Sequence, residues 1–192
     1  MKNYLFVILF CTITTILFAQ QKKDSLQTKL KFATVAQVGL LAGNSASSAG
    51  VQLINGVTYK KIFVGLGIGL DYYLYRGFPV FADVRYHLTQ KKNTLFLYAD
   101  GGIHLPWQRK EVNNVQAKLR NGFYTDIGFG YKLMQKNGNA LVMSFGYTHK
   151  KVSEERKEFI WLPVVWDLNI PEQTVKYHYG LNRIAIKFGL MF

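Results

Sequence analysis

Apolar and polar residues alternate along much of this chain, and the last segment shows the pattern most simply. In residues 183–192, one set of alternate positions is apolar throughout, whereas the other is mostly small or charged and contains Arg183 and Lys187. Because successive side chains of a strand point to opposite faces of a sheet, this pattern predicts a strand with one apolar and one polar face. The apolar set is Ile184, Ile186, Phe188, Leu190 and Phe192.

The same alternation predicts seven earlier strands, and no long helical periodicity interrupts them. The connections after the second, fourth and sixth strands are short turns, whereas those after the fifth and seventh, at 108–121 and 150–173, are long. Short turns at one end and long loops at the other are typical of outer-membrane barrels. The seven strands are predicted at residues 30–41, 49–59, 62–75, 80–88, 94–107, 122–133 and 140–149.

The polar face of each strand must be enclosed within the fold. A closed barrel with an apolar outside and a polar inside encloses it. A soluble barrel that carries an apolar ligand would need the opposite arrangement. Aromatic residues of the apolar face also lie at strand ends, as in the two girdles of membrane barrels. The fold predicted is therefore all-β, an eight-stranded antiparallel up-and-down transmembrane β-barrel. The girdles would comprise Tyr59, Tyr86, Tyr131 and Phe192 at the turn end, and Tyr72, Trp107 and Tyr147 at the loop end.

The first residues have the composition of a targeting segment. Lys2 precedes an apolar run, and Ala19 is a small residue suited to the position before a cleavage site. This pattern predicts a cleaved signal peptide at 1–19, followed by a polar tail at 20–29 and the barrel at 30–192. Cys11 would leave with the signal peptide, so the exported chain would have no cysteine chemistry. The expected location is the outer membrane of a Gram-negative cell.

The net charge of +13 raises the question of a polyanionic partner. Nucleic acid is not expected, because the basic residues lie in turns and loops and no helix or RNA-binding motif presents them. Anionic lipid headgroups explain the charge better. No cofactor is expected, and the 4 histidines are scattered without the spacing of a metal site.

The inward face carries acidic and basic residues in equal number, as a barrel interior with little free water requires. An eight-stranded barrel is just wide enough for side chains to fill it. We interpret the set as an ion-paired plug, with a proton or ion path as the alternative. Arg85 is expected opposite Asp71, or beside Asp83 or Asp100. The set is Asp71, Asp83, Asp100 and Asp126 with Arg85, Lys132, Arg183 and Lys187.

Catalysis is an alternative without a specific motif. Ser144 is predicted to face inward, and Ser153 follows His149 by four residues near the loop end. His149 would serve Ser153 as a general base if the loop folded back. His104 is predicted to face inward near the same end. These residues would suit a lipid A or surface hydrolase at the barrel rim, but no catalytic residue is assigned.

The connection at 150–173 is the best candidate for a binding surface. A stretch of mixed charge is followed by an apolar, aromatic one that contains Phe159, Trp161 and Trp166. Exposed apolar patches on loops mark contacts with partners. We therefore predict a structural or surface-binding barrel that works through its outer loops, with a hydrolase or a narrow channel for ions or small solutes as alternatives.

The whole exported chain resembles the small outer-membrane β-barrels common in the Bacteroidetes, with the architecture of OmpX/OmpA-type eight-stranded barrels. The resemblance rests on the signal peptide, the strand count and the final strand ending in Phe192. Such a strand is similar to the signal that the barrel-assembly machinery recognises. The resemblance implies that assembly machinery, outer-membrane lipid and lipopolysaccharide are partners, and it carries over no catalytic residue.

Overall fold

A computed structural model describes residues 30–43, 46–73, 76–107, 117–159 and 172–192, and these form nine strands. The predicted signal peptide and tail at 1–29 lie outside the described residues. No helix in the described part of the chain is long and apolar enough to cross a membrane. The strands are β1 (Lys31–Gly43), β2 (Ser47–Tyr59), β3 (Ile62–Asp71), β4 (Gly77–His87), β5 (Thr94–Pro106), β6 (Ala117–Arg120), β7 (Gly122–Met134), β8 (Ala140–Phe159) and β9 (Glu172–Met191).

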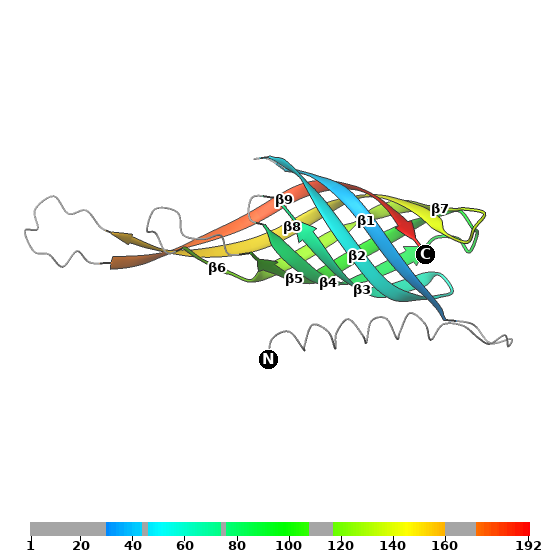
Figure 1. The fold of residues 1–192 in the computed structure, drawn as a ribbon, viewed down its shortest axis with the longest axis horizontal. Helices are drawn as coiled ribbons and strands as arrows, with labels where there is room; N and C mark the ends of the chain where they lie inside the picture. Colours follow the sequence, from blue (N-terminus) through cyan, green and yellow to red (C-terminus); the bar gives the residue numbers. More distant parts are fainter. Residues whose placement is uncertain (1–29, 44–45, 74–75, 108–116, 160–171) are drawn as a thin grey trace, which may run out of the picture.

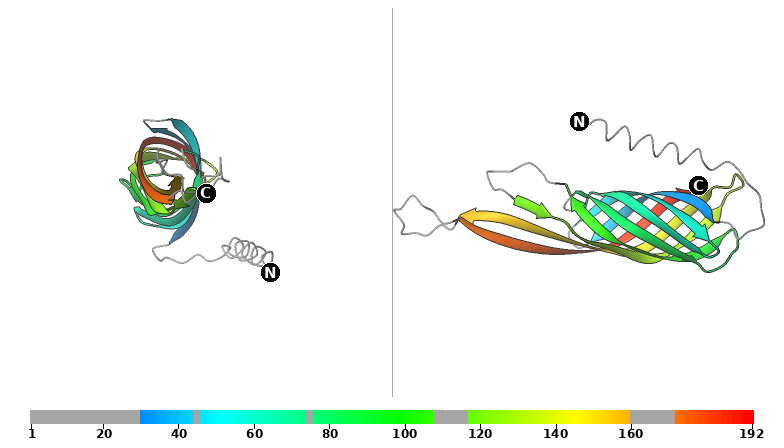
Figure 2. Two further views of the ribbon diagram at one scale, coloured as in Figure 1. Left: turned by 90° about the vertical axis from the view of Figure 1, so that its left-hand side faces the viewer. Right: turned by 90° about the horizontal axis from the view of Figure 1, so that it is seen from below.

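Eight of these strands close into an antiparallel barrel, as the alternation predicted. Each strand pairs with the next in order, with β5 pairing with β7, and β9 returns to pair with β1 (Figure 1). At the seam, the Thr34 amide donates to the Phe192 carbonyl at 2.7 Å and the Phe192 amide donates to the Thr34 carbonyl at 3.0 Å. Figure 2 shows the closed ring end-on. Closure leaves no sheet edge within the barrel wall.

The outer surface of the barrel is apolar, because the apolar set of each strand points outward. In β3, exposed and buried residues alternate almost without a break. Leu66 is 74% exposed, whereas Phe63, on the inward face of the same strand, is fully buried. The inward positions hold the small, charged and aromatic residues. This arrangement is the reverse of that in a water-soluble barrel.

The strand ends define two different ends of the barrel. We call the end that carries the β2–β3, β4–β5 and β7–β8 connections the turn end, and the opposite end the loop end. The girdle residues Tyr59, Tyr86, Tyr131 and Phe192 lie on the outer surface toward the turn end. Tyr72, Trp107 and Tyr147 lie on it toward the loop end. All seven are between 41% and 59% exposed.

The prediction of a long loop at 150–173 is wrong over much of that range. β8 continues ten residues past His149 to Phe159, and β9 begins at Glu172, so the two strands form a ribbon well beyond the barrel (Figures 1 and 2). The predicted loop at 108–121 likewise contains β6, which pairs with β8. Smaller differences are that β3 ends at Asp71 and β4 begins at Gly77. These strand segments were not predicted because they are rich in charged residues. A strand exposed to water lacks the alternate apolar residues on which the prediction of a strand depends.

Two turns require a left-handed backbone. Gly138, in the β7–β8 turn, has φ of 90°, and Lys60, in the two-residue β2–β3 turn, has φ of 54°. Glycine adopts this region without the steric cost that a Cβ atom introduces. The Asn-Gly pair at 137–138 is therefore a true turn signal.

Gly138 and Gly101 form a matched pair for testing this cost, because a Cβ at either position would meet nothing within 4 Å. Gly138 alone of the two has a positive φ. We expect Gly138→Ala to lower the free energy of unfolding by about 1 kcal/mol, as measured by urea titration of the barrel in lipid vesicles. Gly101→Ala, in β5, should leave it unchanged or raise it slightly. Equal effects of the two substitutions would contradict this account of the turn.

Candidate functional site

Three buried aspartates lie side by side across the lumen wall. Asp83 of β4 is the cross-strand partner of Asp100 of β5, which in turn is the partner of Asp126 of β7. None is more than 3% exposed. Buried carboxylates are costly unless cations compensate them. The stability of the lumen therefore depends on the basic side chains that contact these three aspartates.

Arg85 compensates the first of these aspartates. Its Nε lies 3.0 Å from Asp83 Oδ1 and its Nη2 lies 2.9 Å from Asp83 Oδ2, a forked geometry that strengthens the pair. The guanidinium also lies 5.6 Å from the ring centroid of Phe63 and 5.4 Å from that of Phe96. Of the partners predicted for Arg85, Asp83 is therefore confirmed and Asp71 is wrong, since the carboxylate that Arg85 contacts is two residues away in its own strand.

Lys187 of β9 reaches across the lumen to the other two aspartates. Its Nζ lies 2.8 Å from Asp126 Oδ2 and 3.9 Å from Asp100 Oδ2. The Tyr98 hydroxyl donates to Asp126 Oδ1 at 2.8 Å, and the Lys187 ammonium lies 4.5 Å from the Tyr98 ring centroid. One cation thus joins strands on opposite sides of the barrel.

A second ion-paired group lies around Asp71 of β3. Asp71 Oδ2 accepts hydrogen bonds from Lys150 Nζ at 2.9 Å and from Arg183 Nη1 at 2.7 Å. Lys150 also donates to the Tyr73 carbonyl at 3.1 Å. Lys150 is fully buried and Arg183 is 1% exposed. The group ties β3 to β8 and β9.

Lys150 is the lumen residue that the sequence analysis missed, because it begins the charged stretch predicted as a loop. Its position in the alternation was the available signal, since Lys150 follows Ser144 and Thr148 on the inward side of β8. Lys132, which was predicted in its place, is half-buried beside Thr94 at the turn end of β7 and forms no ion pair with any described residue. Lys150 thus takes the place of Lys132 among the buried bases, and Glu154 of β8, which is 3% exposed, is a further buried acid that the sequence analysis missed.

Large aromatic side chains fill the rest of the lumen. Phe63 and Phe81 belong to one buried cluster, and Phe96 and Tyr98 belong to another. Tyr98 lies directly against Gly146 of β8, where any Cβ would overlap its hydroxyl. Glycines of the inward face thus make room for rings from nearby strands.

A cavity of about 20 Å³ remains among these side chains. Gln52, Thr148, Arg183 and Lys187 are among its lining residues. Arg183 Nε and Nη2 and Thr148 Oγ1 have no hydrogen-bond partner among the described residues. A polar space of this size holds about one water molecule. At this level the described side chains fill most of the lumen.

The apolar outer surface ends at a definite level on β8 and β9. Tyr147 and Ile184 are cross-strand partners and are 47% and 49% exposed. Two positions further toward the loop end the partners are His149 and Asn182, whose Nδ1 and Oδ1 atoms lie 2.6 Å apart. Beyond them the outward residues are polar or small: Lys151, Ser153, Glu155, Thr174, Lys176, His178 and Gly180.

The inward side of the same two strands changes in the opposite sense. Beyond Lys150 and Arg183 its residues include Val152, which is 1% exposed, and its cross-strand partner Tyr179. The rings of Tyr179 and Tyr177 are stacked at 6.5 Å. Glu154, which is 3% exposed, lies on this side as well. The outward side of the ribbon is therefore polar where that of the barrel wall is apolar, as expected of strands that leave lipid and enter water, and its inward side combines apolar and aromatic residues with a buried acid. We call β6, residues 150–159 and residues 172–182 the projecting sheet.

Charged contacts tie the three strands of the projecting sheet together. Arg120 Nε of β6 lies 3.0 Å from Glu155 Oε1 of β8, and Lys176 Nζ of β9 lies 3.5 Å from the same oxygen. The hydrogen bond from Arg120 is the main cause that holds the pKa of Glu155 below its usual value. The sheet is therefore an ordered structure above the barrel.

The predicted pairing of His149 with Ser153 does not form. His149 contacts Asn182, and the Ser153 Oγ instead lies 2.9 Å from His178 Nδ1. Ser144 and His104 face the lumen and are 7% and 0% exposed. The Ser153–His178 contact was not predicted, because β9 had been expected to begin after His178.

The remaining predicted binding residues can be placed only in part. Phe159 is the last residue of β8, and Trp161 and Trp166 lie outside the described residues. Within the described residues, no group of three or more His, Cys, Asp or Glu side chains is placed to hold a metal ion.

Two solved structures share this fold. The outer membrane protein AlkL, determined by solid-state NMR in DMPC lipid bilayers, matches with a TM-score of 0.54 and 10% identity over 90% of this chain and 94% of AlkL. The crystal structure of the outer membrane protein OprG from Pseudomonas aeruginosa matches with a TM-score of 0.56 and 12% identity over 88% of this chain and 99% of OprG. No family model and no curated protein sequence matches the chain. The chain thus has the fold of outer-membrane β-barrels.

The ion-paired group at Asp71 can be tested by neutralising this aspartate. Asp71→Asn would remove the carboxylate that Lys150 Nζ and Arg183 Nη1 share. We expect the free energy of unfolding, measured by urea titration in lipid vesicles, to fall by about 3–5 kcal/mol. The control Glu155→Gln, on the exposed face of the projecting sheet, should change it little. An Asp71→Asn barrel as stable as the original would contradict the assigned ion pairs.

Proposed function

We propose that this protein is a small outer-membrane barrel, of the kind that its sequence resembles in the Bacteroidetes, that binds a surface partner through its projecting sheet. The observation that carries the proposal is the contrast between the two halves of the molecule. The lumen is packed with paired charges and rings, whereas β8 and β9 continue beyond the apolar surface as an ordered ribbon. A packed lumen leaves the outside as the place where function is performed.

Location in the outer membrane is supported by several features together. The barrel wall is apolar outside, and aromatic residues flank it at both ends. Residues 1–19 have the composition of a signal peptide. The similar folds of AlkL and OprG belong to outer membrane proteins. In the outer membrane, the loop end would face the cell exterior and be surrounded by lipopolysaccharide. The barrel-assembly machinery would recognise the final strand.

On its β9 side, the projecting sheet ends in an edge beside which no further strand is described. β1 ends at Gly43, opposite Arg183, so residues 172–182 of β9 have no strand beside them on that edge within the described part of the chain. Unpaired backbone groups on a strand edge accept an extended segment of another protein as an additional strand. We therefore propose an extended polypeptide as the partner.

The proposal is tested by removing the sheet and keeping the barrel. Val152 and Tyr179 are cross-strand partners, so an Asn-Gly turn can join them in place of residues 153–178. A phage library of short linear peptides would be selected on the full-length protein in lipid nanodiscs. We expect enriched peptides to bind the full-length protein and to lose binding to the shortened one.

Heat-modifiable migration on gels is the control that both barrels are folded. Peptides that bind both proteins equally, or a selection that enriches no peptide, would count against a binding role of the sheet.

Catalysis is a second candidate because Ser153 and His178 are in contact. A serine nucleophile needs a base within hydrogen-bond reach, and the 2.9 Å contact supplies one. A third group that orients the histidine usually completes such a site. Within the described residues, His178 has no carboxylate partner, so we favour a cross-strand contact without catalysis.

The two readings of this contact differ in what Ser153→Ala should change. If the contact is not catalytic, cells with Ser153→Ala and cells with the original chain should have the same lipid A composition by mass spectrometry. A lipid A species that disappears with Ser153→Ala and also with His178→Gln would establish a hydrolase. Asn182→Ala is the matched control, because it breaks the neighbouring His149 contact on the same face.

A further inference from the structure

The turn end of the barrel carries a concentrated positive charge. Lysines lie in or beside each of the three turns, and others lie on the adjoining strands β1 and β7. No Asp or Glu occurs in the strand ends and turns at 30–33, 58–63, 86–96, 130–141 and 189–192. We call this set the lysine collar: Lys31, Lys60, Lys61, Lys91, Lys92, Lys132 and Lys136.

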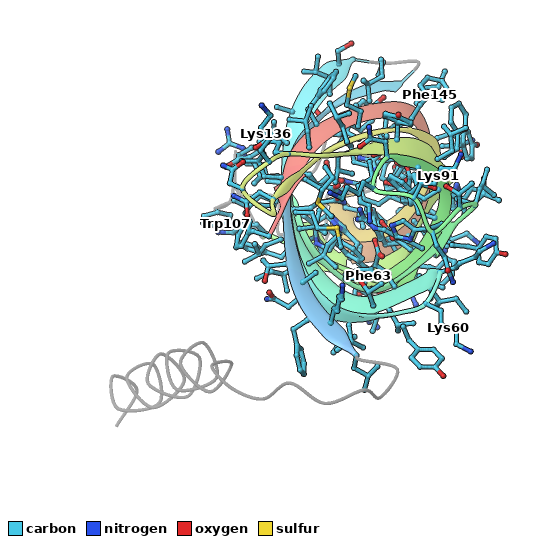
Figure 3. All side chains as sticks on the ribbon, turned by 90° about the vertical axis from the view of Figure 1, so that its right-hand side faces the viewer. Lys60, Phe63, Lys91, Trp107, Lys136 and Phe145 are labelled. Carbon is cyan, nitrogen blue, oxygen red and sulfur yellow. The ribbon has the colours of Figure 1, made fainter. Side chains whose placement is uncertain are left out.

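The collar surrounds the barrel and is not confined to one side. Figure 3 views the molecule from this end, and the labelled Lys60, Lys91 and Lys136 lie around its periphery. These three lysines are exposed. Lys61 is half-buried and its Nζ donates to the Leu88 carbonyl at 3.1 Å.

The loop end is different, because several of its bases have acidic partners. Arg120 and Lys176 share Glu155, and Lys150 and Arg183 share Asp71. Internal ion pairs of this kind neutralise charge within the protein. The collar has no such acids within the described strand ends and turns, so its exposed lysines are available to anions outside the chain.

The position of the collar identifies the source of these anions. Lys60 directly follows the girdle residue Tyr59, and its Nζ lies 5.3 Å from the Tyr59 ring centroid. Tyrosines of a girdle lie at the level of the lipid headgroups. A two-residue turn cannot carry its lysines far beyond that level, so the ammonium groups remain among the headgroups. A membrane anion fits this geometry better than a soluble acidic protein.

We propose that the lysine collar binds anionic phospholipid headgroups, of the phosphatidylglycerol class, in the leaflet at the turn end. Lysines at the surface of an anionic leaflet are attracted to it. Binding by the collar would enrich anionic lipid around the barrel and would fix its depth and orientation in the membrane. The inference requires that the barrel span a membrane, but it does not depend on the binding role of the projecting sheet.

Native mass spectrometry of the purified full-length barrel can count the lipids that stay bound. The probe is an equimolar mixture of phosphatidylglycerol and phosphatidylcholine in neutral detergent. We expect phosphatidylglycerol to be retained in preference, and the preference to weaken at high salt. The combined substitution of Lys60, Lys61, Lys91 and Lys92 by Gln should reduce the preference at least about tenfold, since each lysine at an anionic surface contributes about fivefold.

The matched control removes four positive charges from the loop end, by Gln substitution of Arg76, Arg120, Lys151 and Lys176. This variant should keep the preference. The inference is overturned if the original chain shows no preference or one that salt does not change. It is also overturned if the collar variant keeps the preference, or if both variants lose it equally. Heat-modifiable migration separates these outcomes from a barrel that has failed to fold.

Discussion

The pairing of β9 with β1 is the contact on which the rest of the structure depends. Without it, the sheet would expose two rows of unpaired backbone groups, which lipid cannot hydrogen-bond. The reciprocal hydrogen bonds between Thr34 and Phe192 belong to this seam. Once the sheet is closed, every residue of the wall must face either the outside or a narrow interior. The alternation of the sequence then decides which residues go where.

A closed barrel of eight strands has little interior space, and this limit explains the lumen. Charged residues placed inside cannot be hydrated freely, so each carboxylate needs a base within reach. Asp71, with Lys150 and Arg183, and Asp126, with Lys187, meet this need with partners from distant strands. The same pairs hold opposite walls together. The ion pairs that neutralise the lumen therefore also fill it and leave little room for a solute path.

The two ends of the molecule handle charge in different ways. At the loop end, the outward side of β8 and β9 changes from apolar to polar between Tyr147 and His149, and the inward side changes in the opposite sense. This inversion allows the strands to continue as a three-stranded sheet above the apolar surface. At the turn end the strands stop at once, and lysines without acidic neighbours surround the opening. The molecule is thus asymmetric along the barrel axis in both shape and charge.

The sequence by itself determined the number of barrel strands, the face on which most residues of the barrel wall lie and the position of the short turns. These features follow from local properties, namely the period of two, the turn residues and the apolar set of each strand. It also determined most members of the lumen set, because parity alone places Asp83 or Lys187 inside.

Only the tertiary structure decided which charges meet, since partners such as Asp71 and Arg183 lie on different strands and are brought together by barrel closure and register. It also decided that β8 and β9 continue past Lys150. A strand in water shows no continuous apolar set, so its stability comes from pairing with strands distant in sequence. For the same reason Lys150 looks like a loop residue in the sequence, whereas in the fold it is a fully buried partner of Asp71.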